Sequence, residues 1–501
     1  MRKIPATMCT QHPDHASLPY WDKGGGPFIS TKEETEECFS AFSDLRAEEF
    51  MWDWEGKYVD EAVIERLLAG HFDFFKKKQL GKDIFLTYRI PNIWAEPEYS
   101  LPRAFMTILS FARLAKDMGF AEPPVFEIIL PMADSAKKMM YIQKTFTEFS
   151  KSIGKLFGYK KTLDYLNILP LMEDVGDLLH PERILNSYFA MHKKYYGFTP
   201  PYLRPHIARS DPAMNAGLVP AVLSAKAAIS GFYKFGEKKN IAVYPAIGVG
   251  SLPFRGACNP NNINEFLDEY KGIRTVYIQS AFRYDYPLED VKKSIRLINK
   301  QAPLLKPERY SGEEIEEIGR INETAGKYYR KTVEQLAPFI NKKSEYVPRR
   351  RERRLHIGLF GYARAIGNKK LPRAIPFTAI LYSLGVPPEF IGTGRAIKRL
   401  NKKQLTLAEK IYKNFKRDLV YAGRFLNKHN LKELEKMNSA WRGIAEDIEI
   451  LEKYFGLELG PWSNEDMIYR NLTGNVLLKL KDKKDISELI AHTGKYRRSL
   501  G

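Results

Sequence analysis

The stretch that decides the fold class is LNILPLMED, residues 166–174. Its first part is short and mostly apolar, and it ends in two adjacent carboxylates. A short apolar run bounded by polar residues is typical of a buried strand. Seven similar runs occur, and most of the eight begin 30–45 residues apart. They are EFMWDWEG (49–56), DIFLTYRIPN (83–92), VFEIILPMAD (125–134), YLRPHIARSD (202–211), IAVYPAIGVGS (241–251), RTVYIQSAFR (274–283) and LHIGLFGYAR (355–364).

The sequence between these runs is long enough for helices, as in DEAVIERLLAGHFDFFKKKQ (60–79). Strands that alternate with helices form parallel sheets, and eight of them predict an α/β fold of the (β/α)₈ TIM-barrel type with additional helices. After about residue 395, apolar residues fall at helical spacing and β-rich runs vanish, which predicts a helical C-terminal extension. We therefore expect one domain over residues 1–501, with a barrel core at about 45–395 and a helical part at about 396–501.

Composition narrows the classes of partner. The chain has 501 residues, 44% of them hydrophobic, and a net charge of +19. An excess of positive charge favours an anionic partner: a nucleic acid, a membrane surface, or a phosphorylated or carboxylated small molecule. The three cysteines are scattered, which argues against a disulfide framework or a zinc site. The sequence shows no signal-like apolar region near its start and no run of 18 apolar residues, so we expect a cytoplasmic protein without a membrane span.

Charged residues and glycines recur where the predicted strands end. In a TIM barrel the active site is built at the carboxyl ends of several strands. A strand that simply runs into a polar loop would explain any single case, but the repetition favours a site. The charged residues in question are Asp53, Glu55, Arg89, Asp134, Glu173, Asp211, Arg255, Arg283 and Arg364.

Two carboxylates are candidate metal ligands. Glu173 follows one predicted strand and Asp211 follows the next, with little histidine or thiol nearby. Such oxygen donors suit Mg²⁺ or Mn²⁺. An alternative for Asp211 is a helix N-cap, because Pro212 follows it.

Candidate anion-binding groups lie in GVGSLPFRGACNP (248–260) and in separate arginines. Glycine lets the backbone approach an anion closely, and arginine binds phosphate and carboxylate bidentately. The glycine spacing differs from a nucleotide P-loop. The predicted substrate-binding residues are Gly248, Gly250, Ser251, Arg89, Arg364 and Arg373, with Arg255 in the same loop and Arg283 a further arginine near the same end. The basic run Arg349–Arg354 is expected to be a solvated or oligomer-facing surface, with nucleic-acid contact as the alternative.

The stretch MCTQHPDHA (8–16) places His12 and His15 near the start of the chain. Pro13 disfavours a helical conformation at His12. A neutral imidazole is the usual general base near neutral pH, whereas a surface histidine without a function is the plain alternative. We take His12 as the candidate base and expect His15 to support the segment.

Six motifs in order carry a family resemblance: TQHPD (10–14), PLMED (170–174), ARSDPAMNAG (208–217), GVGSLPFRG (248–256), QSAFRYDY (279–286) and LPRAIPFTAILYSLGVPPEFIGTG (371–394). Over nearly its whole length the chain resembles phosphoenolpyruvate carboxylase of the shorter archaeal type, with weaker similarity to the longer bacterial and plant enzyme. The resemblance implies a cytoplasmic homotetramer that carboxylates phosphoenolpyruvate with bicarbonate, giving oxaloacetate and phosphate, with Mg²⁺ or Mn²⁺.

The resemblance also implies roles for individual residues. Glu173 and Asp211 would hold the metal. Arg255 would stabilise carboxyphosphate, and His12 would deprotonate it. The remaining arginines would contact the substrate, and they are Arg89, Arg373 and, as the best candidate for the preceding basic residue, Arg364.

This chain departs from the longer enzymes at three places. Met214 stands where they have a lysine, and Val249 where they have an arginine. The end KYRRSLG (495–501) does not match their asparagine-containing tail, which puts inhibition by aspartate or malate in doubt. Two alternatives to this activity remain: another metal-dependent barrel lyase or aldolase, and a nucleic-acid binder that uses the positive charge.

Overall fold

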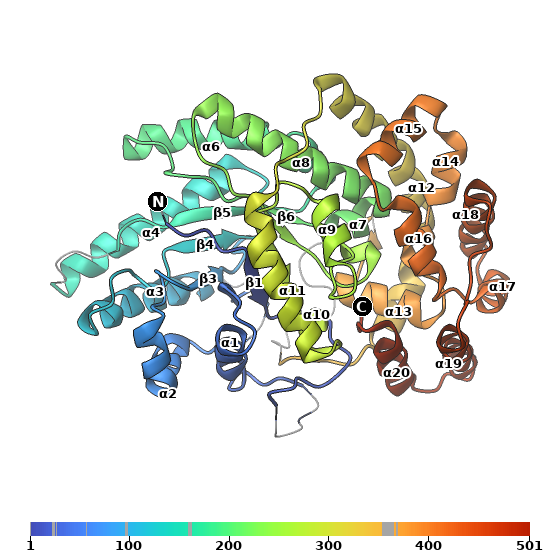
Figure 1. Cartoon of the computed structure of the whole chain (residues 1–501), viewed down its shortest axis with the longest axis horizontal. Helices are drawn as coiled ribbons and strands as arrows, with labels where there is room; N and C mark the ends of the chain where they lie inside the picture. The colour runs from blue at the N-terminus through green and yellow to red at the C-terminus, as the bar shows by residue number, and fades with distance from the viewer. Residues whose placement is uncertain are drawn as a thin grey trace.

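The computed structural model describes residues 2–22, 26, 28–56, 58–95, 99–158, 163–352, 365–366 and 369–501. In this part of the chain, eight strands form a closed barrel, each strand parallel to its neighbours and in chain order. The predicted (β/α)₈ TIM-type barrel is confirmed (Figure 1). Its strands are β1 (Thr7–Thr10), β2 (Glu49–Asp53), β3 (Phe85–Arg89), β4 (Glu127–Leu130), β5 (Asn167–Met172), β6 (His206–Ala208), β7 (Ala246–Gly248) and β8 (Thr275–Ile278).

The first strand differs from the sequence prediction. β1 pairs with β2 on one side and with β8 on the other, where Thr7 lies opposite Val276. The run 355–364, which we predicted as the eighth strand, lies outside the described residues. β1 is the residues TMCT, and all four are buried although two are polar. Hydrogen bonds satisfy these polar groups, as when Thr7 Oγ1 donates to Asn299 Oδ1 at 2.7 Å. Because the strand is buried without being apolar, its sequence does not look like a buried strand.

Helices follow the strands and cover the barrel (Figure 1). Their burial pattern is amphipathic, as in α11, where Val291, Ile295 and Ile298 face the core. The helices of the barrel include α1 (Glu34–Ser43), α2 (Val63–Lys77), α3 (Ser100–Asp117), α4 (Ala136–Leu156), α6 (Pro181–Tyr196), α8 (Leu218–Lys239), α9 (Ile263–Glu269) and α11 (Leu288–Gln301). Short helices begin where strands end, and they are α5 (Val175–Leu179), α7 (Ser210–Ala216), α10 (Ser280–Tyr284) and the 3₁₀ turn η1 (Pro253–Arg255).

A body of helices packs beside the barrel (Figure 1). It starts with α12 (Gly312–Ser344), whose N-terminus is fixed by a capping box between Ser311 and Glu314. Its apolar core includes α7 and α8 residues such as Met214 and Val222, so this body and the barrel share buried surface. The remaining elements are the 3₁₀ turn η2 (Ala302–Leu304), β9 (Ala365–Ile366), β10 (Lys369–Lys370), α13 (Ala374–Ser383), the 3₁₀ turn η4 (Pro388–Phe390), α14 (Thr393–Arg399), α15 (Lys402–Ile411), α16 (Phe415–Gly423), α17 (Lys428–Met437), α18 (Ala440–Phe455), α19 (Asn464–Lys481) and α20 (Ser487–Arg497).

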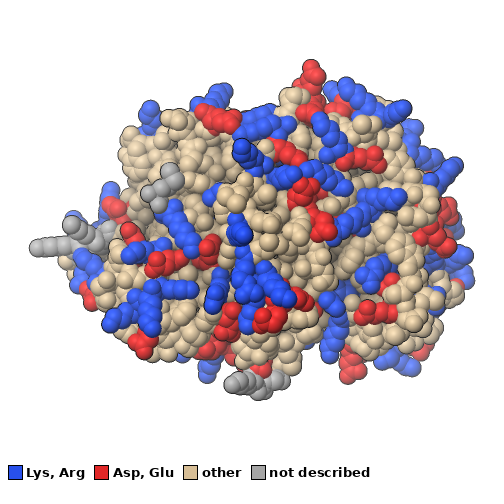
Figure 2. Space-filling model, in the orientation of Figure 1, with Lys and Arg blue, Asp and Glu red and all other residues tan. Residues whose placement is uncertain are grey.

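The surface and the helix lengths bear on possible partners. On the face drawn in Figure 2, acidic side chains are interspersed among the basic ones. Within the described ranges, no single helix is long and apolar enough to cross a membrane. The segments Ala374–Ser383 and Pro388–Arg399 reach the required length only together, and they meet at a bend of 99°.

Candidate functional site

The loop after β7 places Arg255 at the rim, by which we mean the carboxyl ends of the barrel strands and the residues directly after them. Gly250 donates its N–H to the Arg255 carbonyl at 2.8 Å, which folds the loop back on itself. A Cβ on Gly250 would lie 2.9 Å from the guanidinium carbon of Arg255. Gly256 has φ +126°, and a Cβ there would lie 2.5 Å from a methyl carbon of Val249. Both glycines are therefore needed for the path of this loop.

The Arg255 side chain joins three strand ends, and only 1% of the residue is exposed. Its Nε donates to Ser210 Oγ, after β6, at 3.1 Å. Its Nη2 donates to Gln279 Oε1, after β8, at 2.6 Å. Its Nη1 lies 3.3 Å from Asp14 Oδ2, after β1, and also donates to the main-chain oxygen of Gly501. The guanidinium that the sequence singled out is thus the centre of a network that spans the rim.

His12 is half-buried and lies two residues after β1. Its Nδ1 is 2.8 Å from Thr10 Oγ1, which fixes the ring. The neighbouring Gln11 accepts the N–H of Asp53 at 2.9 Å, so the end of β1 is tied to the end of β2. The predicted candidate base therefore lies on a strand end that the barrel holds in place.

His15 has a different environment. Burial lowers the pKa of His15 to about 3, so the ring is neutral. Its Nδ1–H donates to the Ser17 carbonyl at 2.7 Å. These contacts agree with a supporting role for His15 in the segment.

Arg89 ends β3 and lies in an ion-pair cluster. Its Nε and Nη2 contact Asp53 Oδ1 and Oδ2 at 2.8 and 2.6 Å, and its Nη1 lies 2.9 Å from Glu55 Oε2. Asp53 and Arg89 are register partners on adjacent strands, which explains their contact. Burial lowers the pKa of Arg89, but these two carboxylates outweigh burial and hold it well above its usual value. A bound anion would therefore share this guanidinium with Asp53 and Glu55.

The two candidate metal ligands lie at neighbouring strand ends. Glu173 directly follows β5, Asp211 lies in the first turn of α7 after β6, and both are half-buried. The N-cap interpretation of Asp211 is wrong, because the N-cap residue of α7 is Arg209. Asp174 instead caps α5, accepting the N–H of Gly176 at 2.7 Å.

This donor set fits a hard cation. Glu173 and Asp211 both offer carboxylate oxygens, and Mg²⁺ needs only one or two protein carboxylates. Among the residues that the structure describes, no group of three or more His, Cys, Asp or Glu side chains is arranged to hold a metal ion. Water and substrate oxygens would complete the coordination of Mg²⁺ or Mn²⁺ there.

The other predicted binding residues have varied positions. Gly248 ends β7, and its carbonyl accepts the Arg209 N–H at 3.1 Å. Ser251 is buried in the same loop as Arg255. Arg373 is half-buried and precedes α13, a helix that contacts α7. Arg364 lies outside the described residues.

Two of the candidate arginines, Arg283 and Arg351, lie in buried ion pairs with Glu37. Arg283 is buried, with Nη2 at 2.6 Å from the Thr10 carbonyl and 2.9 Å from Glu37 Oε1. Arg351 is buried too, and contacts both oxygens of Glu37 at 2.7 and 2.6 Å. Burial raises the pKa of Glu37, but Arg351 and Arg283 outweigh it and lower the value to about 2. The expectation of a solvated surface is therefore wrong for Arg351, whereas Arg353 and Arg354 lie outside the described residues.

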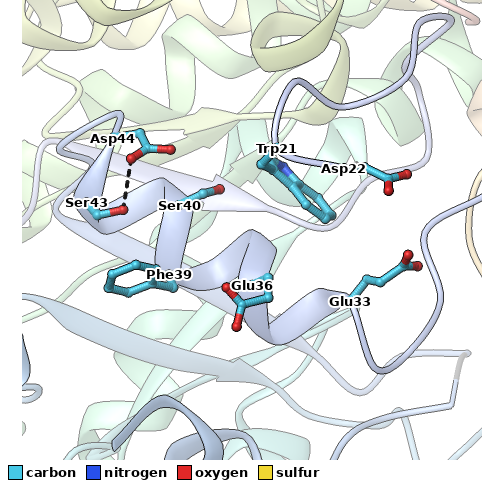
Figure 3. A pocket seen from close by; sticks show the side chains of 8 residues that line it. All are labelled: Trp21, Asp22, Glu33, Glu36, Phe39, Ser40, Ser43 and Asp44. Carbon is cyan, nitrogen blue, oxygen red and sulfur yellow. Dashed lines mark hydrogen bonds between the residues drawn. The ribbon is translucent and has the colours of Figure 1, made fainter. Parts of the chain in front are cut away.

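A pocket of about 420 Å³ lies between α1 and the segment before it (Figure 3). It contains none of the predicted site residues, and its acidic side chains already have contacts such as the Ser43–Asp44 hydrogen bond at 3.1 Å. Its lining residues are Trp21, Asp22, Glu33, Glu36, Phe39, Ser40, Ser43 and Asp44.

Sequence reasoning missed the partners that hold Arg255. Asp14, Ser210 and Gln279 all lie within motifs quoted above, but motif matching gave them no role. Because Asp14 and Arg255 are 241 positions apart, no local pattern could pair them.

Comparison with known proteins gives the family of the chain. The family model described as phosphoenolpyruvate carboxylase matches residues 4–501. The chain belongs to the phosphoenolpyruvate carboxylase family. The match covers the barrel and the helical body alike, and it confirms the resemblance seen in the motifs.

Curated relatives of this family align over essentially their full length. A phosphoenolpyruvate carboxylase from Leuconostoc mesenteroides is 40% identical over 503 residues, covering 100% of this chain and 99% of the relative. One from Metallosphaera sedula is 39% identical over 530 residues, with 100% of both chains covered. One from Picrophilus torridus is 35% identical over 526 residues, with 99% of each covered.

Proposed function

We propose that this chain carboxylates phosphoenolpyruvate with bicarbonate to give oxaloacetate and phosphate, an anaplerotic carbon fixation. The observation that carries the proposal is the placement of Arg255, which connects the ends of β1, β6 and β8 in a chain whose family match spans residues 4–501. A fixed guanidinium at a barrel rim suits a reaction in which a phosphoryl group moves between oxygens.

The first step transfers the phosphoryl group. A bicarbonate oxygen forms a bond to phosphorus, and the bond from phosphorus to the enol oxygen of phosphoenolpyruvate breaks, which leaves carboxyphosphate and the enolate of pyruvate. Arg255 binds the phosphoryl oxygens, whose negative charge its guanidinium stabilises. Arg89, Arg364, Arg373 and the loop around Ser251 bind the substrate's phosphate and carboxylate.

The second step forms the new carbon–carbon bond. His12 takes the proton of carboxyphosphate, whose carbon–oxygen bond to the phosphate then breaks to release carbon dioxide and phosphate. The methylene carbon of the enolate attacks carbon dioxide and gives oxaloacetate. Thr10 orients the His12 ring through its contact with Nδ1.

The carboxylates of Glu173 and Asp211 would hold Mg²⁺ or Mn²⁺. When bound, the metal supplies Lewis-acid stabilisation of the enolate oxygen and orients the substrate. Gly248 and Gly250 keep the neighbouring loop backbone close to the rim, which places Ser251 and Arg255 there.

The test is a coupled assay. Purified protein with phosphoenolpyruvate should oxidise NADH through added malate dehydrogenase only when bicarbonate and a divalent metal are both present. A metal-dependent barrel lyase or aldolase acting on a 2-oxo acid would need the metal but not bicarbonate, so metal-dependent turnover without bicarbonate would replace the proposal with that alternative. A nucleic-acid binder would instead show tight binding that weakens steeply with salt.

We further propose that residues 1–501 act as a single carboxylase domain, assembled as a cytoplasmic homotetramer without nucleic-acid or membrane partners. The shared core of α7, α8 and the helical body supports one domain. Light scattering coupled to size exclusion should give a mass four times 57.8 kDa.

A further inference from the structure

Asp14 lies two residues after the candidate base His12, and its side chain is completely buried. Its Oδ1 accepts the N–H of Ala281, in α10 after β8, at 2.9 Å. Its Oδ2 lies 3.3 Å from Nη1 of Arg255. One carboxylate therefore connects the strand end that carries His12 with β8 and with Arg255.

The main chain of Asp14 is fixed as well. Its carbonyl accepts the Leu500 N–H at 2.6 Å and the Ser499 hydroxyl at 3.3 Å. With both its backbone and its side chain held, the carboxylate of Asp14 has a defined position relative to the barrel.

Charge distinguishes Asp14 from the neutral partners of Arg255. Ser210 and Gln279 offer neutral oxygens, whereas Asp14 offers a side-chain carboxylate to the buried Arg255 guanidinium, whose Nη1 also donates to a main-chain oxygen of Gly501. A buried guanidinium without a counter-ion carries an uncompensated desolvation cost, so a nearby carboxylate both stabilises it and selects its orientation. Burial raises the pKa of Asp14, and the Arg255 guanidinium opposes that rise.

We propose that Asp14 is a positioning residue that holds the Arg255 guanidinium and His12 as one unit, so that both act on the same carboxyphosphate. This role rests on the function proposed above. In the second step, His12 must take a proton from the intermediate that Arg255 holds. A shift between the two groups would slow that step and leave the enolate to be protonated, which yields pyruvate in place of oxaloacetate.

The first test is Asp14→Asn. The amide oxygen can still accept the Ala281 N–H, but the NH₂ group would face the Nη1 donor of Arg255 and the ion pair is lost. We expect kcat for oxaloacetate to fall about 10- to 100-fold, since misplacement by about 1 Å can cost a hundredfold. We expect the KM for phosphoenolpyruvate to stay within about threefold and the fraction of pyruvate to rise. An unchanged kcat and pyruvate fraction would overturn the proposal.

The second test is a double-mutant cycle with Arg255→Lys. If Asp14 acts through Arg255, then Asp14→Asn should lower kcat little further when Arg255 is already lysine. The kcat of the double variant should therefore stay within about threefold of the kcat of the less active single variant. If the two losses in kcat multiply, Asp14 acts independently of Arg255 and the proposed role is wrong.

Asp285→Asn is the matched control. The Asp285 carboxylate accepts the N–H groups of Ala16 and Ser17 at 2.8 and 2.6 Å, so it anchors the same segment through backbone groups. This variant should lower the unfolding midpoint without raising the pyruvate fraction. If it raises that fraction as much as Asp14→Asn does, general loosening of the segment explains the effect and the proposal fails.

Two further results keep the test decisive. Should Asp14→Asn fail to fold, the cycle is run with Asp14→Glu, which keeps the charge but displaces the carboxylate by one methylene, with the same expectations for the coupling. A wild-type protein that makes no bicarbonate-dependent oxaloacetate would overturn the proposed function itself. If the wild-type protein makes oxaloacetate and the two losses in kcat multiply in the double variant, only the role of Asp14 is overturned.

Discussion

Glu389 is a buried carboxyl group that should make stability depend on pH. It lies in η4 with no exposed surface, and its Oε1 accepts the N–H of Phe254 at 2.8 Å and the hydroxyl of Tyr382 at 2.5 Å. In the described part of the chain, its Oε2 has no hydrogen-bond partner. Burial is the main cause that raises the pKa of Glu389 to about 7. Since Phe254 precedes Arg255, the same group also anchors the loop that carries the central arginine.

The direction of the effect follows from proton linkage. The folded pKa of about 7 lies above the ordinary value of 4.5, so the folded state holds the proton more tightly. The stabilisation is fully present below about pH 4.5 and is lost as the pH rises through about 7. A shift of this size corresponds to about 3 kcal/mol in the free energy of unfolding.

Glu389→Gln removes this titration. The amide oxygen keeps both hydrogen bonds, while the buried NH₂ adds a cost of about 1–3 kcal/mol that does not depend on pH. Between pH 5 and pH 9, the stability of the variant relative to wild type should therefore rise by about 3 kcal/mol. Denaturant unfolding at a series of pH values, followed by circular dichroism, measures this difference.

Glu289→Gln is the control for the pH series. Glu289 lies exposed on α11 beside Lys292, and its replacement should leave the pH dependence of unfolding nearly unchanged. If the difference between Glu389→Gln and wild type stays constant from pH 5 to pH 9, Glu389 titrates equally in the folded and unfolded states. The reasoning from burial would then be refuted.

Three further changes test the site and its support. His12→Asn should abolish oxaloacetate formation while slow hydrolysis of phosphoenolpyruvate to pyruvate persists, measured with malate and lactate dehydrogenase as coupling enzymes; full carboxylation by this variant would remove the role of His12. Asp211→Asn should raise the Mg²⁺ concentration for half-maximal activity at least tenfold, whereas Asp174→Asn, which alters only the cap of α5, should leave it unchanged; equal shifts in both variants would argue against Asp211 as a ligand. Glu37→Gln should lower the free energy of unfolding by about 3–5 kcal/mol, because Arg351 and Arg283 lose a buried counter-ion, and an unchanged denaturation midpoint would show that these ion pairs add no stability.

The fold was largely predictable because each of seven barrel strands can be recognised from its own short stretch of sequence. β5 is a short apolar run followed by carboxylates, and β2, β3 and β4 are likewise short, mostly apolar runs with charged residues at or soon after their ends. β1 was missed because its outer residues, Thr7 and Thr10, are polar, and what buries them is a set of contacts with distant residues. Burial is a property of the whole fold, and a four-residue strand is too short for hydrophobic periodicity to reveal it.

The positions of the candidate site residues were more predictable from the sequence than their contacts were. Motifs and strand ends indicated Arg255 and Arg89, and both lie at the rim. The ion pairs of Arg89 with Asp53 and of Arg351 with Glu37 were not predicted, because the paired residues are 36 and 314 positions apart. A run of basic residues is typical of an exposed surface, yet Arg351 in this run is buried in an ion pair with Glu37, which comes from a distant part of the sequence.

The closure of the barrel by β1 has a consequence for how the chain folds. Thr7 pairs with Val276, so the last seam of the sheet joins segments separated by most of the barrel sequence. Contacts of such separation carry a large loop-closure entropy and slow folding. During synthesis, β1 presents an unpaired edge until β8 has emerged, and an unpaired edge readily pairs with another chain. Thr10 ends that strand, so His12, the candidate base two residues later, reaches its place only when the barrel has closed.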